Sequence, residues 1–178
     1  MRGVHVVVMI SLALTAAATA AEPREAPADA WPMARGCAAG TGRSAGTLPL
    51  PLVEAWRREF SGGAFGAVPV VADGTVFVGD LDGTFRALAL SDGTDRWSFT
   101  APDAGFTAAA AIGAAGATRL VVAGDDIGMI RGFDAATGEV RWEHAMDGEI
   151  SGGPTILHAA EPRVLVGDLM PPEHGSRD

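Results

Sequence analysis

Aspartates gather in two short glycine-containing stretches, which makes these stretches the first candidates for chemistry. They are Asp80-Leu81-Asp82-Gly83 and Gly124-Asp125-Asp126-Ile127-Gly128. A Ca²⁺ ion takes six to eight oxygen ligands, and an EF-hand loop supplies them from alternating positions that end in a distant Glu. Neither stretch has this pattern, whereas Asp and Gly are also the residues that tight turns require. We therefore interpret both stretches as turns and predict no metal site in them.

Histidine, serine and cysteine residues form no catalytic pattern. His144, His158 and His174 stand far apart, without the spacing of metal ligands. Ser151 precedes two glycines but lacks the Gly-x-Ser-x-Gly arrangement of a hydrolase nucleophile. Cys37 is the single cysteine, so an intramolecular disulfide is excluded. A lone thiol in an exported chain either pairs between molecules or stays idle, and we expect an idle thiol.

The acidic turns occupy equivalent places in a long internal repeat. Trp56, Trp97 and Trp142 are separated by 41 and 45 residues. Each is followed by an apolar residue, namely Phe65, Phe106 and Ile150. Each is then followed by an apolar run that ends in Gly-Asp, at residues 76–80, 120–125 and 164–168. Periods of about 40 to 50 residues that hold several short strands are typical of propeller blades.

Inside one copy, strand-forming runs alternate with glycine turns. Asp73-Gly74 separates two apolar runs by the two residues of a tight β-hairpin, and Asp82-Gly83 and Asp92-Gly93 mark further turns. The expected strands cover residues 70–72, 75–78, 84–90 and 97–99. No part of the repeats shows the 3.6-residue apolar period of a helix. The prediction is an all-β fold of antiparallel four-stranded sheets.

The most detailed repeat is an eleven-residue segment at 87–97 that returns at 132–142. Each copy starts with a small residue, turns at Asp92-Gly93 or Thr137-Gly138, and ends in Arg-Trp. The segment resembles the tryptophan-docking motif Ala-x-Asp-x-x-Thr-Gly-x-x-x-Trp of the pyrroloquinoline-quinone (PQQ) quinoprotein propellers. The resemblance implies a partial β-propeller with two complete blades and part of a third.

The match to this motif is uneven between the two copies. The first copy has Ala89 and Asp92 where the motif has Asp and Thr, and the second has Gly132 where it has Ala. The resemblance implies that each Trp docks on a neighbouring blade, because an indole is a large flat apolar surface with one N–H donor. The predicted structural docking residues are Trp56, Ala87, Gly93, Trp97, Asp134, Thr137, Gly138 and Trp142.

The same blades occur in PQQ-dependent dehydrogenases and in non-catalytic BamB-like scaffolds, so the resemblance implies two functions. The dehydrogenases hold the quinone and a Ca²⁺ ion among Glu, Asn, Asp and Arg side chains, and many carry a Cys pair. This chain has no Asn and one Cys, so no catalytic or cofactor-binding residue can be transferred to it. We predict a non-catalytic, protein-binding module without a cofactor. The alternative is the N-terminal part of a PQQ-dependent dehydrogenase, which would need PQQ and Ca²⁺.

The first twenty residues are typical of a secretory signal peptide. Arg2 precedes the apolar segment 6–14, and Ala18-Thr19-Ala20 has the small-x-small form of a cleavage site. The apolar segment is shorter than the roughly 20 residues of a membrane span. We predict a periplasmic or extracellular protein with no membrane span after cleavage, and a retained N-terminal anchor is the alternative. Residues 21–30 are rich in Ala, Pro and acids and are expected to form a flexible lead-in.

The propeller repeats are expected to cover residues 31–168, with blades near 55–96, 97–141 and 142–168. After 168 the pattern stops at Pro171-Pro172, and residues 169–178 are predicted to form a disordered tail. Propellers typically close with four to eight blades. The chain is therefore expected to be a fragment of a longer propeller, or to complete a ring by self-association.

The charge balance limits the partners. The formal net charge is −9, which argues against nucleic acid and against attraction to anionic lipid. An exposed sheet edge can accept a strand from another protein. A protein partner is the class of ligand that this sequence favours.

Overall fold

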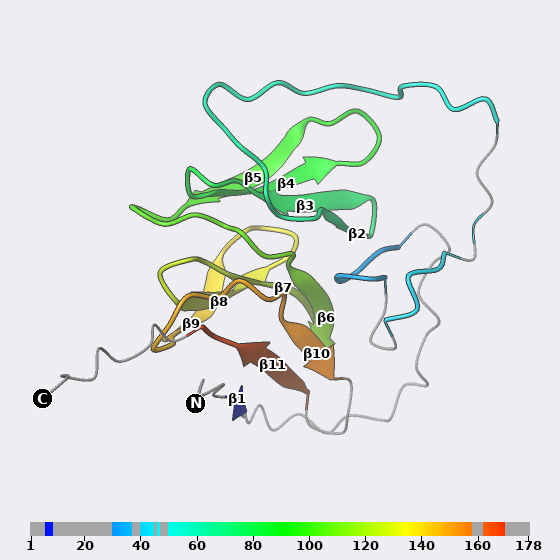
Figure 1. The fold of residues 1–178 in the computed structure, drawn as a ribbon. Helices are drawn as coiled ribbons and strands as arrows, with labels where there is room; N and C mark the ends of the chain where they lie inside the picture. Colours follow the sequence, from blue (N-terminus) through cyan, green and yellow to red (C-terminus); the bar gives the residue numbers. More distant parts are fainter. Residues whose placement is uncertain are drawn as a thin grey trace, which may run out of the picture.

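The computed structural model describes residues 30–36, 40–44, 46, 50–157 and 162–169, together with the backbone of 6–8. These residues form eleven β-strands and no helix. The predicted all-β class is therefore confirmed. Three sheets follow one another, and each contains only antiparallel pairs (Figure 1).

The first sheet is a four-stranded meander in which each strand pairs with the next. Its strands are β2 (Val70–Ala72), β3 (Thr75–Gly79), β4 (Thr84–Ala89) and β5 (Asp95–Thr100). They overlap the four predicted strands, with ends that differ by at most two residues. The two-residue turn at Asp73-Gly74 sets the register that places Val70 opposite Phe77. Buried residues alternate along β3, with Phe77 facing the core.

The second sheet repeats this meander. Its strands are β6 (Ala111–Ala115), β7 (Thr118–Gly124), β8 (Met129–Asp134) and β9 (Val140–Ala145). Trp97 and Trp142 stand within β5 and β9, the fourth strands of these sheets. The predicted blades near 97–141 and 142–168 begin at these residues, so each predicted blade is offset from its sheet. The offset arises because the most conspicuous residue of the repeat belongs to the last strand of one sheet, not to the start of the next.

The third sheet contains two strands of the repeat. They are β10 (Thr155–Leu157) and β11 (Arg163–Gly167), and β1 (Val6–Val8) pairs with the other edge of β11. β1 lies inside the predicted signal peptide. The first residue of the predicted tail, Leu169, forms a bridge with Glu149. Residues 170–178, the other residues of the predicted signal peptide and residues 21–29 of the lead-in lie outside the described residues.

The three sheets meet at their first strands, as blades meet near a propeller axis. Among the described strands, both contacts between different sheets involve β6, which contacts β2 of the first sheet and β10 of the third (Figure 1). Side chains fill the two spaces between the sheets. Phe85, Phe106 and Phe133 belong to the first cluster, and Ile130 and Ile150 to the second. Burial at this scale contributes about 25 cal/mol per Å² of apolar surface.

Candidate functional site

The joint between the first and second sheets is built around Trp97. This side chain is 9% exposed and lies on the β8–β9 turn of the second sheet. Its Nε1 donates a hydrogen bond to the carbonyl of Ala135 at 3.0 Å. Its ring covers Gly138, where an added Cβ would lie 2.6 Å from the indole. Gly138 also has a φ of +76°, which other residues rarely adopt, so glycine is required at this position on two grounds.

Trp56 makes the same arrangement one repeat earlier. Its Nε1 donates to the carbonyl of Leu90 at 2.8 Å, and its ring covers Gly93 in the β4–β5 turn. A Cβ on Gly93 would lie 2.6 Å from this indole. The structure thus brings two of the predicted tryptophans onto turns of the sheet that follows them in the chain.

Trp142 lies differently. It is half-buried, and the Nε1 of its indole has no hydrogen-bond acceptor within the part of the chain that the structure describes. Its ring covers Gly132 of its own sheet so closely that a Cβ there would overlap it. The equivalent residue in the first copy is Ala87, which pairs with Trp97 and has room for its methyl group. Glycine instead of the motif's alanine at position 132 therefore leaves space for the Trp142 ring, which approaches this backbone closely.

The two docking turns are stabilised by different side chains. In the second copy, Asp134 accepts the N–H groups of Ala136 and Thr137 at 3.0 and 3.2 Å, and Arg141 donates to its other oxygen at 2.9 Å. The bond from Arg141 holds the pKa of Asp134 below its usual value, against the opposing effect of burial. The Asp134 carboxylate raises the pKa of Arg141 in turn.

In the first copy, Ala89 replaces this aspartate, and Asp92 stabilises the turn instead. Its carboxylate accepts the N–H of Thr94 at 2.9 Å and the hydroxyl of the same residue at 2.7 Å. These bonds, the backbone one first, lower the pKa of Asp92. The methyl side chain of Ala89 cannot accept a hydrogen bond. Arg96, the equivalent of Arg141, therefore donates to Thr75 Oγ1 instead, at 2.7 Å. The sequence departures at 89 and 92 are thus compensating changes.

In the acidic turns, buried aspartates bind backbone N–H groups and an arginine of their own sheet. Asp80 is 1% exposed, accepts the N–H of Asp82 and of Thr84, and pairs with Arg86. Arg86 stands six positions after Asp80 in the sequence. We call the combination of a buried Asp, the backbone N–H four residues on and the Arg six residues on the aspartate–arginine clasp.

The second sheet has the same clasp. Asp125 is fully buried, accepts the N–H of Met129 at 2.7 Å and pairs with Arg131 at 2.6 Å. Sequence reasoning singled out the aspartates as turn formers but did not identify Arg86 and Arg131 as their partners. The signal was present in the spacing, because both arginines stand six positions after an Asp that ends an apolar run.

A second contact repeats between neighbouring sheets. Phe106 lies on Gly79 and Ile150 lies on Gly124, with too little space for a side chain at either glycine. Both apolar residues come from the segment that leads into the next sheet. Gly167, at the equivalent place in β11, has no atom within 4 Å of an added Cβ among the described residues. In each of the two joints between sheets, an apolar side chain thus packs directly against a glycine of the preceding sheet.

Comparison with known proteins agrees with this geometry. A family model described as outer membrane protein assembly factor BamB matches residues 53–166. The chain belongs to this family. None of the curated proteins matches it.

Two solved structures share the fold of this BamB-family chain. BamB from Moraxella catarrhalis is 22% identical, with a TM-score of 0.51 over 65% of this chain and 37% of that one. Quinohemoprotein alcohol dehydrogenase from Comamonas testosteroni is 21% identical, with a TM-score of 0.55 over 72% of this chain and 22% of that one. The chain thus spans well under half of either structure. At such identities the likeness establishes the fold alone, and it confirms the predicted PQQ-like propeller blades.

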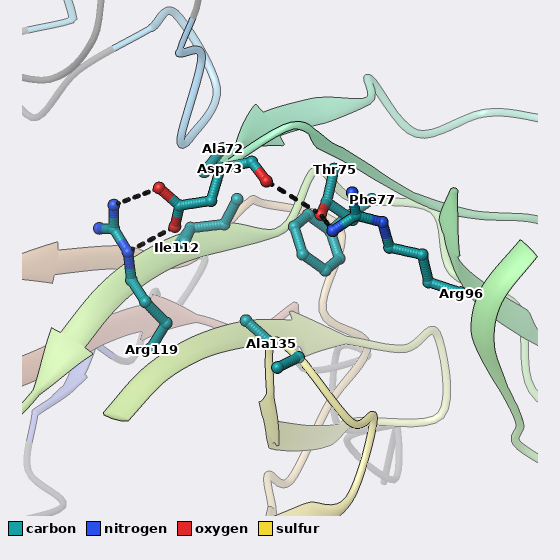
Figure 2. A pocket seen from close by; sticks show the side chains of 9 residues that line it. Ala72, Asp73, Thr75, Phe77, Arg96, Ile112, Arg119 and Ala135 are labelled. Atoms are coloured by element: carbon teal, nitrogen blue, oxygen red, sulfur yellow. Dashed lines mark hydrogen bonds and ion pairs between the residues drawn. The ribbon is translucent and has the colours of Figure 1, made fainter. Parts of the chain in front are cut away.

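One small cavity of about 140 Å³ lies between the first two sheets of the BamB-family chain. Its walls include Ala72, Phe77, Ile112 and Ala135, and its charged rim is already paired (Figure 2). The Nε and Nη2 atoms of Arg119 bind Asp73 at 2.8 and 3.1 Å. Pockets for drug-sized ligands are larger, at about 300 to 1,000 Å³. We therefore interpret this cavity as a packing gap that an ion pair between two blades covers.

The other residues considered for chemistry are not brought together. His144 and Ser151 are exposed, and Cys37, His158 and His174 lie outside the described residues. Within the described ranges, no three His, Cys, Asp or Glu side chains are grouped so as to hold a metal ion. The described part of the chain also has no helix long and apolar enough to cross a membrane.

Proposed function

We propose that this BamB-family chain is an exported, non-catalytic scaffold that binds protein partners in the bacterial envelope. Its family is described as an outer membrane protein assembly factor, which supports a role in holding other envelope proteins. The acidic turns support the non-catalytic reading, because both oxygens of Asp80 and of Asp125 already bind N–H groups or arginines of the chain.

The observation that carries the proposal is a repeated exposed aliphatic residue. One such residue follows each of the buried Asp80, Asp125 and Asp168 within two positions: Leu81, Ile127 and Leu169 are 43%, 60% and 58% exposed. Leu81 and Leu169 also share their backbone pairing, because their N–H groups bind the carbonyls of Ala64 and Glu149 at 2.8 Å. A contiguous exposed apolar surface marks a protein-interaction site, and we propose that these three side chains contribute to one such surface.

Site-specific photocrosslinking in the envelope tests this proposal. A photoreactive residue at Ile127 should form a discrete adduct with an envelope protein. The matched control is Leu90, which is 36% exposed but lies in the β4–β5 turn, and which should form none. Replacing Leu81 and Leu169 together by Ser should abolish the adduct at 127 without changing the melting temperature, because both side chains are already exposed.

An enzymatic assay tests the alternative, that the chain has dehydrogenase activity. The purified protein is given PQQ, Ca²⁺, primary alcohols or sugars, and a redox dye that accepts the electrons. We expect no sustained dye reduction above the level without protein. Repeated turnover would contradict the scaffold role and favour a dehydrogenase. Equal adducts at Ile127 and Leu90 would contradict the proposed surface.

A further inference from the structure

The aspartate–arginine clasp follows a fixed register in the two complete sheets. Arg86 in β4 stands opposite Val78 in β3, and Arg131 in β8 stands opposite Ala123 in β7. In both cases the buried Asp lies two residues after that opposite position, at 80 and 125. The third strand of each sheet therefore supplies the arginine that neutralises the Asp at the end of the second strand.

The third sheet has the aspartate without the arginine. Asp168 stands two residues after Val166 of β11, and it is 6% exposed. Its Oδ2 accepts the N–H of Gly148 at 3.0 Å, whereas its buried Oδ1 has no partner in the described part of the chain. A buried carboxylate oxygen without a hydrogen bond is strongly unfavourable.

β1 occupies the third-strand position in this sheet but carries the wrong residue for the clasp. Its pairing with β11 shows that the β11 edge accepts an antiparallel strand. Val7 stands opposite Val166, in the register that Arg86 and Arg131 take in the other sheets. Valine has no side-chain donor. Cleavage of the predicted signal peptide would also remove β1 from the β11 edge.

We propose that the β11 edge, together with Asp168, is a binding site for an extended protein segment that carries an arginine opposite Val166. The guanidinium would bind Asp168 Oδ1, and main-chain hydrogen bonds to β11 would hold the segment, as in other cases of strand addition. The third strands of this chain give the matching pattern, apolar–Arg–small–apolar, in Phe85-Arg86-Ala87-Leu88 and Ile130-Arg131-Gly132-Phe133. The site does not depend on the proposed scaffold role.

Peptide binding to the full chain tests the site. The probe is a fluorescein-labelled peptide with the sequence of residues 83–90, and its match has Gln in place of the arginine. Fluorescence polarisation should show that the Arg peptide binds about tenfold or more tightly than the Gln peptide. D168N should remove this difference by weakening the Arg peptide alone. The control D147N removes an exposed acid and changes the net charge by the same amount as D168N. It should leave the difference between the two peptides intact.

The comparison of the two peptides needs no change to the protein, so it holds even if D168N folds poorly. V7P, which removes a donor from β1, should strengthen binding of the Arg peptide by freeing the edge. Equal affinities of the Arg and Gln peptides for the wild-type chain would overturn the proposal. So would an Arg preference that survives in folded D168N, or the absence of any binding to both the wild type and V7P.

Discussion

The joint between the first and second sheets differs from the one between the second and third. In the first joint, Trp97 is docked on Gly138, Phe106 lies on Gly79, and the clasps on both sides are closed. In the second joint, Ile150 lies on Gly124, but Trp142 covers its own sheet and Asp168 has one unpartnered oxygen. The first and second sheets have the same antiparallel strand order and the same kind of register shift, at Ala87/Leu88 and at Gly132/Phe133.

This difference indicates that a blade is completed by its neighbours and not by its own hydrogen-bond ladder. The tryptophan comes from one blade and its docking turn from the next, whereas each apolar residue precedes the later blade and lies on a glycine of the earlier one. Stability in such repeat architectures resides largely in the interfaces between units. Three sets of measurements test this difference between the two joints.

Removing the two tryptophans should give the largest contrast. Trp97→Ala should lower the free energy of unfolding by about 3–5 kcal/mol, because a buried indole and its hydrogen bond to Ala135 are lost. Trp142→Ala should cost about half as much, since that side chain is half-buried and undocked. Urea denaturation followed by far-ultraviolet circular dichroism measures both. Equal losses would mean that docking on the next blade adds nothing.

Neutralising the clasp aspartates should give the next contrast. Asp125→Asn leaves buried Arg131 without its carboxylate, which should cost about 3 kcal/mol. Asp168→Asn removes a carboxylate that no cation faces within the described residues, so the change should be near zero or stabilising. Thermal and urea unfolding of the two variants test this. A large loss in D168N would show that its clasp is closed by some other group.

The smallest expected effect is on acid stability and concerns the docking turn that Asp134 stabilises. The pKa of Asp134 is lowered in the folded chain, chiefly by Arg141, so its ion pair stabilises the fold above the unfolded pKa of about 3.9. That contribution should be lost as the pH falls through the lower pKa of the folded state. Melting temperatures between about pH 2 and pH 6 should therefore depend less on pH in Asp134→Asn. An unchanged pH profile in this variant would contradict the role of the pair.

Strands and turns were predictable because local signals define them. Asp73-Gly74 and Asp92-Gly93 fall at turns of the first sheet, and the alternation of Phe85 and Ala87 with polar residues matches the buried face of β4. The grouping of the strands into sheets was less accessible. Trp97 marks the repeat most clearly, yet it lies in the last strand of its sheet, so units divided at this residue are offset from the sheets.

The candidate site was predictable only in part. The docking residues were accessible because a tryptophan and a turn glycine recur at one spacing. The clasp was not identified, because each acid was interpreted from its glycine turn alone, whereas the signal is the arginine six positions later, in the next strand. The pairing of β1 with β11 had no local signal at all, since it joins residues about 160 positions apart.

The all-β class, the turn positions and the repeat follow from the amino-acid sequence alone, because hairpin register and burial alternation depend on residues close together in the chain. Three other properties could be learned only from the folded chain: which tryptophan is docked, which aspartate is neutralised and which sheet edge lacks its arginine. These properties depend on contacts between blades, where an indole needs an acceptor and a buried carboxylate needs a donor from a distant segment.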